Sequence, residues 1–169
     1  MGNRYVVTPD DGETVWLLRL GARGVLAGGE TDGRFSLVEH PLPPRALGAP
    51  VHTHEHEDEY SFVLEGEVGV EIGGESFVAG AGALVRKPRG IPHAFWNAGD
   101  EPARILEIIS PAGFERYFPE AAALFADGVI DPQRAARLWA RYGLTMDISS
   151  LPRLIAAHNL VVEPAPLAH

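Results

Sequence analysis

Short runs rich in β-branched and aromatic residues, separated by glycine and proline, fill the first two thirds of the chain. These runs predict strands, because branched and aromatic side chains pack well on a pleated surface. The clearest is 68–72, and the pair Gly73-Gly74 after it supplies the positive φ angles of a tight hairpin before the run 75–78. The other runs that predict strands are 5–7, 15–18, 35–39, 60–64, 83–86, 94–96 and 103–109. Short strands at intervals of roughly 8 to 12 residues, without helical periodicity between them, predict an antiparallel barrel or double-sheet jelly roll.

Glycine and proline interrupt this pattern in two places. Residues 21–33 contain five glycines, but no strand followed by a well-formed helix surrounds them. We therefore expect glycine-rich turns there and not a phosphate-binding loop. Pro41, Pro43 and Pro44 should end the strand at 35–39 and give an extended lead into a histidine-rich segment, because proline cannot donate to a sheet.

The hydrophobic period becomes helical after Pro111, where aromatic and aliphatic residues recur at spacings of three and four. Asp131-Pro132 is a strong helix start, because Asp caps free backbone N–H groups and proline suits the first turn. We expect helices at 114–125 with a stop at Gly128, at 132–142 with a stop at Gly143, and at 150–158. We interpret their aromatic stripes as surfaces that pack against the barrel or a partner subunit, not as a cofactor site.

The chain of 169 residues has the length of one domain and can bury a real core. Hydrophobic residues make up 46% of it, and 19 glycines with 14 prolines fit a fold with many turns. We expect residues 1–110 to form a β-barrel domain and residues 111–169 to form a helical extension packed on it. The fold class is therefore mainly β.

Charge and cysteine content narrow the classes of partner. The formal net charge of −9 argues against nucleic acid or an anionic membrane, for which a basic patch would be needed. No apolar run approaches the roughly 20 residues of a membrane span, so we expect no membrane partner and a small-molecule substrate. The chain has no cysteine, which excludes disulfides and thiolate metal ligands; we expect a cytoplasmic protein.

Four residues with metal-binding side chains follow the proline-rich lead. On a strand His52 and His54 project to the same side, with Cα atoms about 6 to 7 Å apart, so both imidazoles can reach one ion. Glu59 follows after a short polar turn, and His93 comes much later. Imidazole and carboxylate suit Fe, Mn, Ni or Zn, and the ligand types alone do not choose among them.

Two segments resemble the motifs of the cupin superfamily. Gly48, His52, His54, Glu59 and Gly66 resemble the first cupin motif, G-x5-H-x-H-x3,4-E-x6-G, although the leading glycine stands closer to the first histidine here. The second motif, G-x5-P-x-G-x2-H-x3-N, is matched at every defined position by Gly82, Pro88, Gly90, His93 and Asn97. The resemblance covers residues 48–97 and says nothing about the chain after Ser110.

The resemblance implies a small jelly-roll barrel that encloses one divalent transition metal per chain, held by His52, His54, Glu59 and His93. The chain resembles single-domain, quercetin-dioxygenase-like cupins. This resemblance implies a dioxygenase that acts, with dioxygen, on an enolisable, flavonol-like or catecholic small molecule. In such enzymes the glutamate also serves as a base, so Glu59 has two candidate roles. Cupin isomerases, cyclases, decarboxylases and non-catalytic binders share these ligands, and these alternatives stay open.

Residues near the four ligands have simpler interpretations. We expect His56 to be a surface or outer-shell group, Glu55 and Glu57 to be a solvated acidic rim, and Gly90 and Asn97 to be turn and shell residues. Glu59 is preferred to Asp58 as the ligand because only Glu59 leaves six residues before the motif glycine.

Several aromatic residues follow the motif strands. Phe62, Phe77, Phe95 and Trp96 are candidates to line an apolar pocket, and strand parity alone does not say which of them face the metal. Because several strands carry branched or aromatic residues on both faces, which a small barrel cannot hide, we expect a homodimer.

Overall fold

The computed structural model of the 169-residue chain describes residues 5–126 and 131–162, so the predicted helix stop at Gly128 lies outside the described residues. The strands are β1 (Thr14–Leu17), β2 (Leu20–Leu26), β3 (Ser36–Leu42), β4 (Leu47–His54), β5 (Asp58–Glu65), β6 (Glu67–Ile72), β7 (Glu75–Gly80), β8 (Leu84–Lys87), β9 (His93–Asn97), β10 (Ala103–Ser110) and β11 (Leu144–Asp147). The α-helices are α1 (Tyr117–Phe125), α2 (Pro132–Arg141) and α3 (Leu151–His158), with 3-10 turns at Gly28–Glu30, Phe114–Arg116 and Ile148–Ser150.

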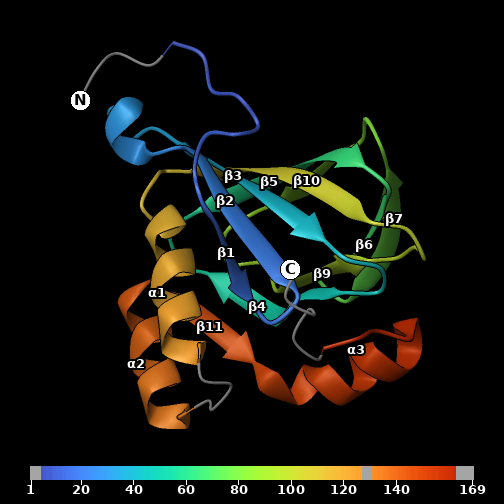
Figure 1. The fold of residues 1–169 in the computed structure, drawn as a ribbon. Helices are drawn as coiled ribbons and strands as arrows, with labels where there is room; N and C mark the ends of the chain where they lie inside the picture. Colours follow the sequence, from blue (N-terminus) through green and yellow to red (C-terminus); the bar gives the residue numbers. More distant parts are fainter. Residues whose placement is uncertain (1–4, 127–130, 163–169) are drawn as a thin grey trace.

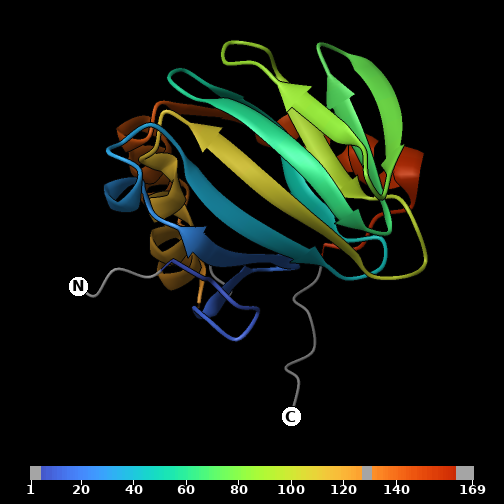
Figure 2. The same ribbon diagram turned by 90° about the horizontal axis from the view of Figure 1, so that it is seen from above.

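The strands form two antiparallel sheets that face each other (Figures 1 and 2). One sheet has the order β1-β2-β3-β10-β5-β8 and the other β11-β4-β9-β6-β7. Strands distant in the sequence are neighbours, as β3 and β10 are, so hairpins alone do not make the fold. The predicted double-sheet jelly roll with C-terminal helices is therefore confirmed.

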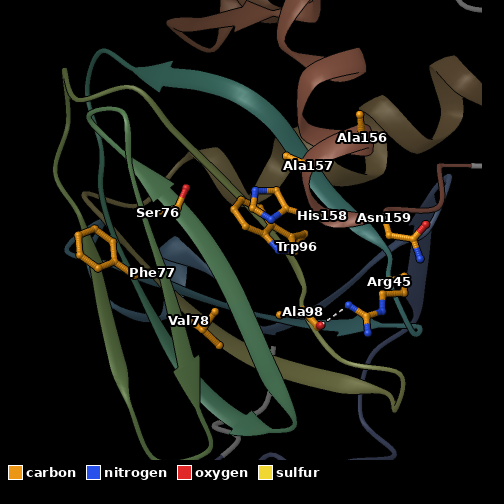
Figure 3. Close-up of a pocket in the computed structure, with 10 residues that line it drawn as sticks. All are labelled: Arg45, Ser76, Phe77, Val78, Trp96, Ala98, Ala156, Ala157, His158 and Asn159. Carbon is orange, nitrogen blue, oxygen red and sulfur yellow. Dashed lines mark hydrogen bonds between the residues drawn. The ribbon is translucent and has the colours of Figure 1, made fainter.

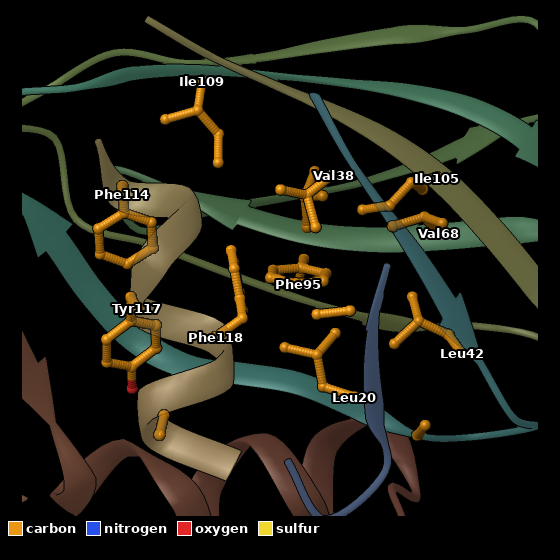
Figure 4. Close-up of a cluster of buried hydrophobic side chains, with 14 of the residues drawn as sticks. Leu20, Val38, Leu42, Val68, Phe95, Ile105, Ile109, Phe114, Tyr117 and Phe118 are labelled. Atoms are coloured by element: carbon orange, nitrogen blue, oxygen red, sulfur yellow. The ribbon is translucent and has the colours of Figure 1, made fainter. Parts of the chain in front are cut away.

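Alternating burial along the strands creates the core between the sheets. In β10 every second residue from Ala103 to Ile109 is buried, and in β3 the same holds from Ser36 to Leu42. Figure 4 shows Phe95 near the centre of the apolar cluster, with the helical turn that carries Phe114 and Phe118 against it. Apolar side chains fill this region, including Val63 of β5 and Val85 of β8, while the other inward positions of these two strands carry the polar Glu59, Ser61 and Lys87.

The helices belong to the segment after Ser110 and cover the barrel (Figure 1). Helix α2 begins as its sequence predicts, because the carboxylate of Asp131 accepts hydrogen bonds from the backbone N–H groups of Gln133 and Arg134. Helix α3 packs the buried Leu154 against Trp96 on the outer face of the five-stranded sheet. Within the described part of the chain, no helix is both long enough and apolar enough to cross a membrane.

Strand β11 was not expected, because the sequence analysis predicts only helices after Pro111. Leu144–Asp147 pairs antiparallel with β4, so that Leu144 lies opposite His54 and Met146 opposite His52. A four-residue run has too little pattern to predict a strand by itself, and here the open edge of β4 supplies its partner. The tail therefore contributes a strand to the sheet that holds three of the predicted metal ligands, His52, His54 and His93.

One predicted strand is wrong. Residues 5–7 form no strand, and the side chains of Tyr5 and Val6 are 87% and 72% exposed. A strand needs a neighbour to take up its backbone hydrogen bonds. The sheet ends at β1, and this segment does not extend it.

Two expectations about glycine and proline also need correction. Much of the region expected to be glycine-rich turns is β2, in which Gly21 lets the chain approach Pro41; a Cβ atom on Gly21 would lie 2.5 Å from the proline ring. Strand β3 continues through Pro41 instead of ending before it. The proline is tolerated because the ladder between β2 and β3 stops at Glu39.

Candidate metal centre

Four strand residues from both sheets converge at one point inside the barrel. His52 and His54 come from β4 and His93 from the start of β9, where His93 lies opposite His52. Glu59 comes from β5 in the facing sheet. One ligand atom from each residue lies within 4.8 Å of all the others, and all four side chains are buried. The structure thus brings together all four residues that the sequence selected.

Backbone carbonyls orient two of the imidazoles. Nδ1 of His52 lies 2.8 Å from the carbonyl oxygen of Pro50, and Nδ1 of His93 lies 2.9 Å from that of Ile91. Each Nδ1 therefore carries the proton and donates it, which leaves the lone pair of Nε2 free to bind a metal.

The spacing of the donor atoms fits one ion. Nε2 of His54 lies 3.5 Å from Oε1 of Glu59, and Nε2 of His93 lies 3.4 Å from Oε2 of the same carboxylate. Ligands at about 2.1 Å from a tetrahedral ion are ~3.4 Å apart. Nε2 of His54 and Nε2 of His93 are buried and make no hydrogen bond. Burying a polar atom without a partner costs free energy, and a bound metal would remove that cost. A buried set of three imidazoles and one carboxylate could therefore hold a divalent transition metal.

A buried ion network lies behind Glu59. Nζ of Lys87, directly across from Glu59 on β8, is 3.0 Å from Oε2 of Glu59 and 2.8 Å from Oε2 of Glu107. Ser61 donates to the same oxygen of Glu107 at 2.8 Å. Burial would raise the pKa of Glu59, but the ammonium of Lys87 together with His54 and His93 outweighs burial and holds that pKa well below its usual value. Glu59 is therefore a carboxylate ready to bind a cation.

Burial also favours the neutral form of two of the histidines, His52 and His93. It lowers the pKa of His52 well below the usual value, with the neighbouring His93 and His54 acting in the same direction. Burial lowers the pKa of His93 as well. Because a metal binds only the neutral imidazole, these shifts favour the binding form at neutral pH.

Two further groups lie beside His54, and one of them differs from expectation. Glu57 is buried instead of forming part of a solvated rim, and its Oε2 lies 3.6 Å from Nδ1 of His54 without a hydrogen bond. The ring of Phe114 meets the His54 ring edge to face, with centroids 4.4 Å apart. The start of the C-terminal extension therefore forms one wall of the site.

The other nearby residues lie outside the cluster. The His56 side chain is 59% exposed, as expected for a surface group. Both carboxylate oxygens of Asp58 accept hydrogen bonds from Arg89, which leaves Glu59 as the acid that faces the histidines. Gly90 is a turn residue, and its backbone N–H donates to the carbonyl of His54 at 2.9 Å. Asn97 ends β9, and its buried amide donates to the carbonyls of Leu42, Pro43 and Glu101.

Of the four aromatic residues proposed for the pocket, only Phe95 belongs to the main core cluster. Phe62 faces outward, because Glu59, Ser61 and other alternate residues of β5 face inward. Phe77 and Trp96 instead line a groove of about 480 Å³ on the outer side of the barrel beside α3 (Figure 3). Trp96 stacks on His158 there, with ring centroids 4.0 Å apart.

Sequence reasoning missed Lys87, Glu107, Glu57 and Phe114. Lys87 had a signal: it is the single lysine of the chain, and it directly precedes the proline of the second motif. Glu107 had a weaker one, since it is the single charged residue in the apolar run 105–109. Glu57 lies in an irregular segment, where no periodicity predicts the direction of a side chain. Phe114 lies in a 3-10 turn, and its helical spacing predicts packing on the barrel but not a place beside His54.

A model of the cupin domain family matches residues 39–109, a range that contains all four clustered residues. The polyketide synthase CurC of Streptomyces cyaneus is 37% identical to this chain over 60 residues, which are 36% of this chain and 39% of CurC. The chain therefore spans well under two thirds of that relative.

Solved structures show the same fold. The polyketide cyclase RemF of Streptomyces resistomycificus is 27% identical, with a TM-score of 0.55, over 65% of this chain and 80% of RemF. KdgF from Halomonas sp. is 17% identical, with a TM-score of 0.59, over 68% of this chain and 99% of KdgF. The cupin domain match therefore covers residues 39–109, and the structural likenesses show that the chain has the same fold as these proteins.

Proposed function

We propose that this cupin protein binds one divalent transition metal through His52, His54, Glu59 and His93 and closes a ring in a small, enolisable, polyketide-like substrate. The observation that carries the metal is the convergence of four buried donor atoms, two of them imidazole nitrogens without any hydrogen bond. The substrate class rests on the likeness to CurC and RemF.

The proposed reaction needs no oxidant. Ring closure joins an enolisable carbon to a ketone carbon of the same molecule; the first carbon loses a proton and the ketone oxygen gains one. When bound, the metal would polarise a substrate oxygen and stabilise the enolate. The protein supplies neutral imidazoles, a fixed carboxylate, and a wall that includes Phe114 and excludes water.

A dioxygenase acting on a flavonol-like or catecholic substrate is the second candidate. The donor set favours it, because three neutral imidazoles and one carboxylate leave a net positive site that attracts an enolate, the electron source that dioxygen requires. The two candidates differ in one observable quantity, which is the consumption of oxygen.

Metal content tests the site. We expect about one metal per chain. Changes to outer-shell residues typically weaken metal binding about 10- to 100-fold, and replacing any one of the four ligands by alanine should weaken it more than that. His56→Ala is the matched control and should retain the metal. Loss of metal from the control with retention in His54→Ala would refute the ligand assignment.

Substrate turnover tests the reaction. The protein, reconstituted in turn with Fe(II), Mn(II), Ni(II), Co(II) and Zn(II), is assayed on β-polyketone chains and on flavonols with and without oxygen. Anaerobic conversion of a polyketone to a cyclic product supports the cyclase. Oxygen uptake with a flavonol and no anaerobic turnover would favour the dioxygenase, and tight binding without turnover would indicate a binding protein.

Glu59→Gln separates the two roles of the carboxylate. If Glu59 is chiefly a ligand, metal content and turnover should fall together. An amide variant that keeps the metal but loses turnover would show that Glu59 acts as a base.

A further inference from the structure

The single lysine of the chain is buried in the barrel. Lys87 is 1% exposed and is the largest of the fully buried side chains. The chain carries 14 basic residues, counting lysine and arginine together. A buried ammonium is costly unless it is fully paired, so this position calls for an explanation. The proposed function assigns Lys87 no role.

Three contacts fix the lysine in place. Its Nζ lies between Glu59 and Glu107, and its ammonium is 4.9 Å from the centroid of the Phe95 ring. Glu107 is held in turn by Ser61. Burial alone would lower the pKa of Lys87, but the two carboxylates reverse this and raise it. The side chain is therefore a permanent cation and not a free amine able to attack a carbonyl.

The contacts divide the two oxygens of Glu59. Oε2 lies 3.0 Å from the ammonium and 3.4 Å from Nε2 of His93. Oε1 lies 3.5 Å from Nε2 of His54. Both oxygens of the carboxylate therefore lie beside the histidines, but only Oε2 is also paired with the lysine.

We propose that Lys87 is a positioning residue of the metal site: it holds one oxygen of Glu59, so that Glu59 binds the metal through the other oxygen alone. The inference rests on the proposed metal site. An oxygen paired with an ammonium is a weaker metal ligand than one that is not, so the contact favours binding through Oε1 and leaves a coordination position open for the substrate. The lysine also keeps Glu59 from leaving the metal to act as a base.

The unaltered protein allows a direct test, because lysine labelled with ¹⁵N gives one side-chain ammonium signal. We expect Zn²⁺ addition to shift this signal in step with occupancy of the site, since the carboxylate that the ammonium contacts becomes a metal ligand. A signal that stays unchanged while Zn²⁺ binds would overturn the proposal.

A charge-neutral double variant, Lys87→Met with Glu107→Gln, removes the lysine without leaving a second carboxylate unpaired. We expect it to bind Zn²⁺ about 10- to 100-fold more weakly than the wild type, as is typical when an outer-shell partner is lost. Its cobalt(II) visible spectrum should also change, because that spectrum depends on the coordination number. Glu107→Gln alone keeps the contact between Lys87 and Glu59 and should bind metal nearly as well as the wild type.

A second control removes an ion pair on the opposite face of the other sheet. Arg153 pairs with Glu71 at 2.6 Å, and Arg153→Met with Glu71→Gln should leave affinity and spectrum unchanged. If wild-type protein binds no metal, the metal site itself is refuted. If wild type binds metal and the Lys87 double variant matches it in affinity and spectrum, only the role of Lys87 is refuted.

Discussion

At the scale of single residues, the barrel holds an unusual number of ionisable side chains away from water. Besides the four clustered residues, Lys87, Glu107 and His40 are each 1% exposed. Their pairing is internal, so the chain bears the cost of desolvating them whether or not a ligand is present. The stability of the fold should therefore respond to pH.

His40 gives the clearest case of this response. Burial lowers its pKa to about 4, and its Nδ1 lies 2.7 Å from the carbonyl of Gly21. Below about pH 6.5 His40 becomes protonated in the unfolded chain but stays neutral in the folded protein. The free energy of unfolding therefore falls as the pH falls, by ~1.4 kcal/mol per pH unit for this residue.

We expect His40→Gln to reduce this loss. Between pH 7 and pH 5 the free energy of unfolding of the variant should fall by about 2 kcal/mol less than that of the wild type, measured by urea denaturation. His56→Gln, which changes an exposed histidine, is the control. The prediction would be contradicted if the free energy of unfolding fell by the same amount in the wild type, His40→Gln and His56→Gln.

At the scale of elements, close contacts between strands limit the size of the side chain that fits at a motif position. Gly48 on β4 lies against Phe95 on β9, and a Cβ atom on Gly48 would be 2.2 Å from the ring. Phe95 contacts Lys87 and lies near His40, so a displaced ring would disturb the polar interior.

Gly48→Ala should lower the free energy of unfolding by about 1–3 kcal/mol, the usual cost of overpacking. Gly24→Ala on β2 is the control, because nothing lies within 4 Å of a Cβ atom there. Urea denaturation of both variants provides the measurement. A loss in the Gly24 variant as large as in the Gly48 variant would remove the steric explanation.

Local pattern predicts most strands of this fold but not all of its site. The hairpin of β6 and β7 is predictable because alternation and the Gly73-Gly74 turn are both local features. Strand β11 was missed because its identity depends on an open edge formed much earlier in the chain. The four-residue cluster was found because motif spacing encodes it, whereas Lys87 depends on a cross-strand partner. The division into residues 1–110 and 111–169 stays a prediction.

At the scale of the whole molecule, the outer face of the six-stranded sheet carries an exposed apolar patch on β5, β8 and β10, beside the ion pairs that Arg104 makes with Glu39 and Glu65. Phe62 and Leu84 are cross-strand partners that are 38% and 58% exposed, and Leu106 lies beside Phe62. An exposed apolar face of this kind is typical of a subunit interface. The expected homodimer would bury it against a second copy.

Light scattering at micromolar concentration should return twice the mass of the 18.2 kDa chain. Phe62→Glu with Leu84→Glu should give a monomer, since each subunit would then bury charge. Val78→Glu, at an exposed position on β7, should leave the dimer intact. A wild-type mass of one chain would refute the dimer.

The pairing of β11 with β4 also has a consequence for the chain while it is being synthesised. Strand β4 leaves the ribosome long before β11, with residues 55–143 between them. Until then the strand that carries His52 and His54 has an unpaired edge, which can accept a strand from another nascent chain. A chain that stops before Leu144 would keep that edge open permanently, so we expect such fragments to aggregate during synthesis even though all four clustered residues are present.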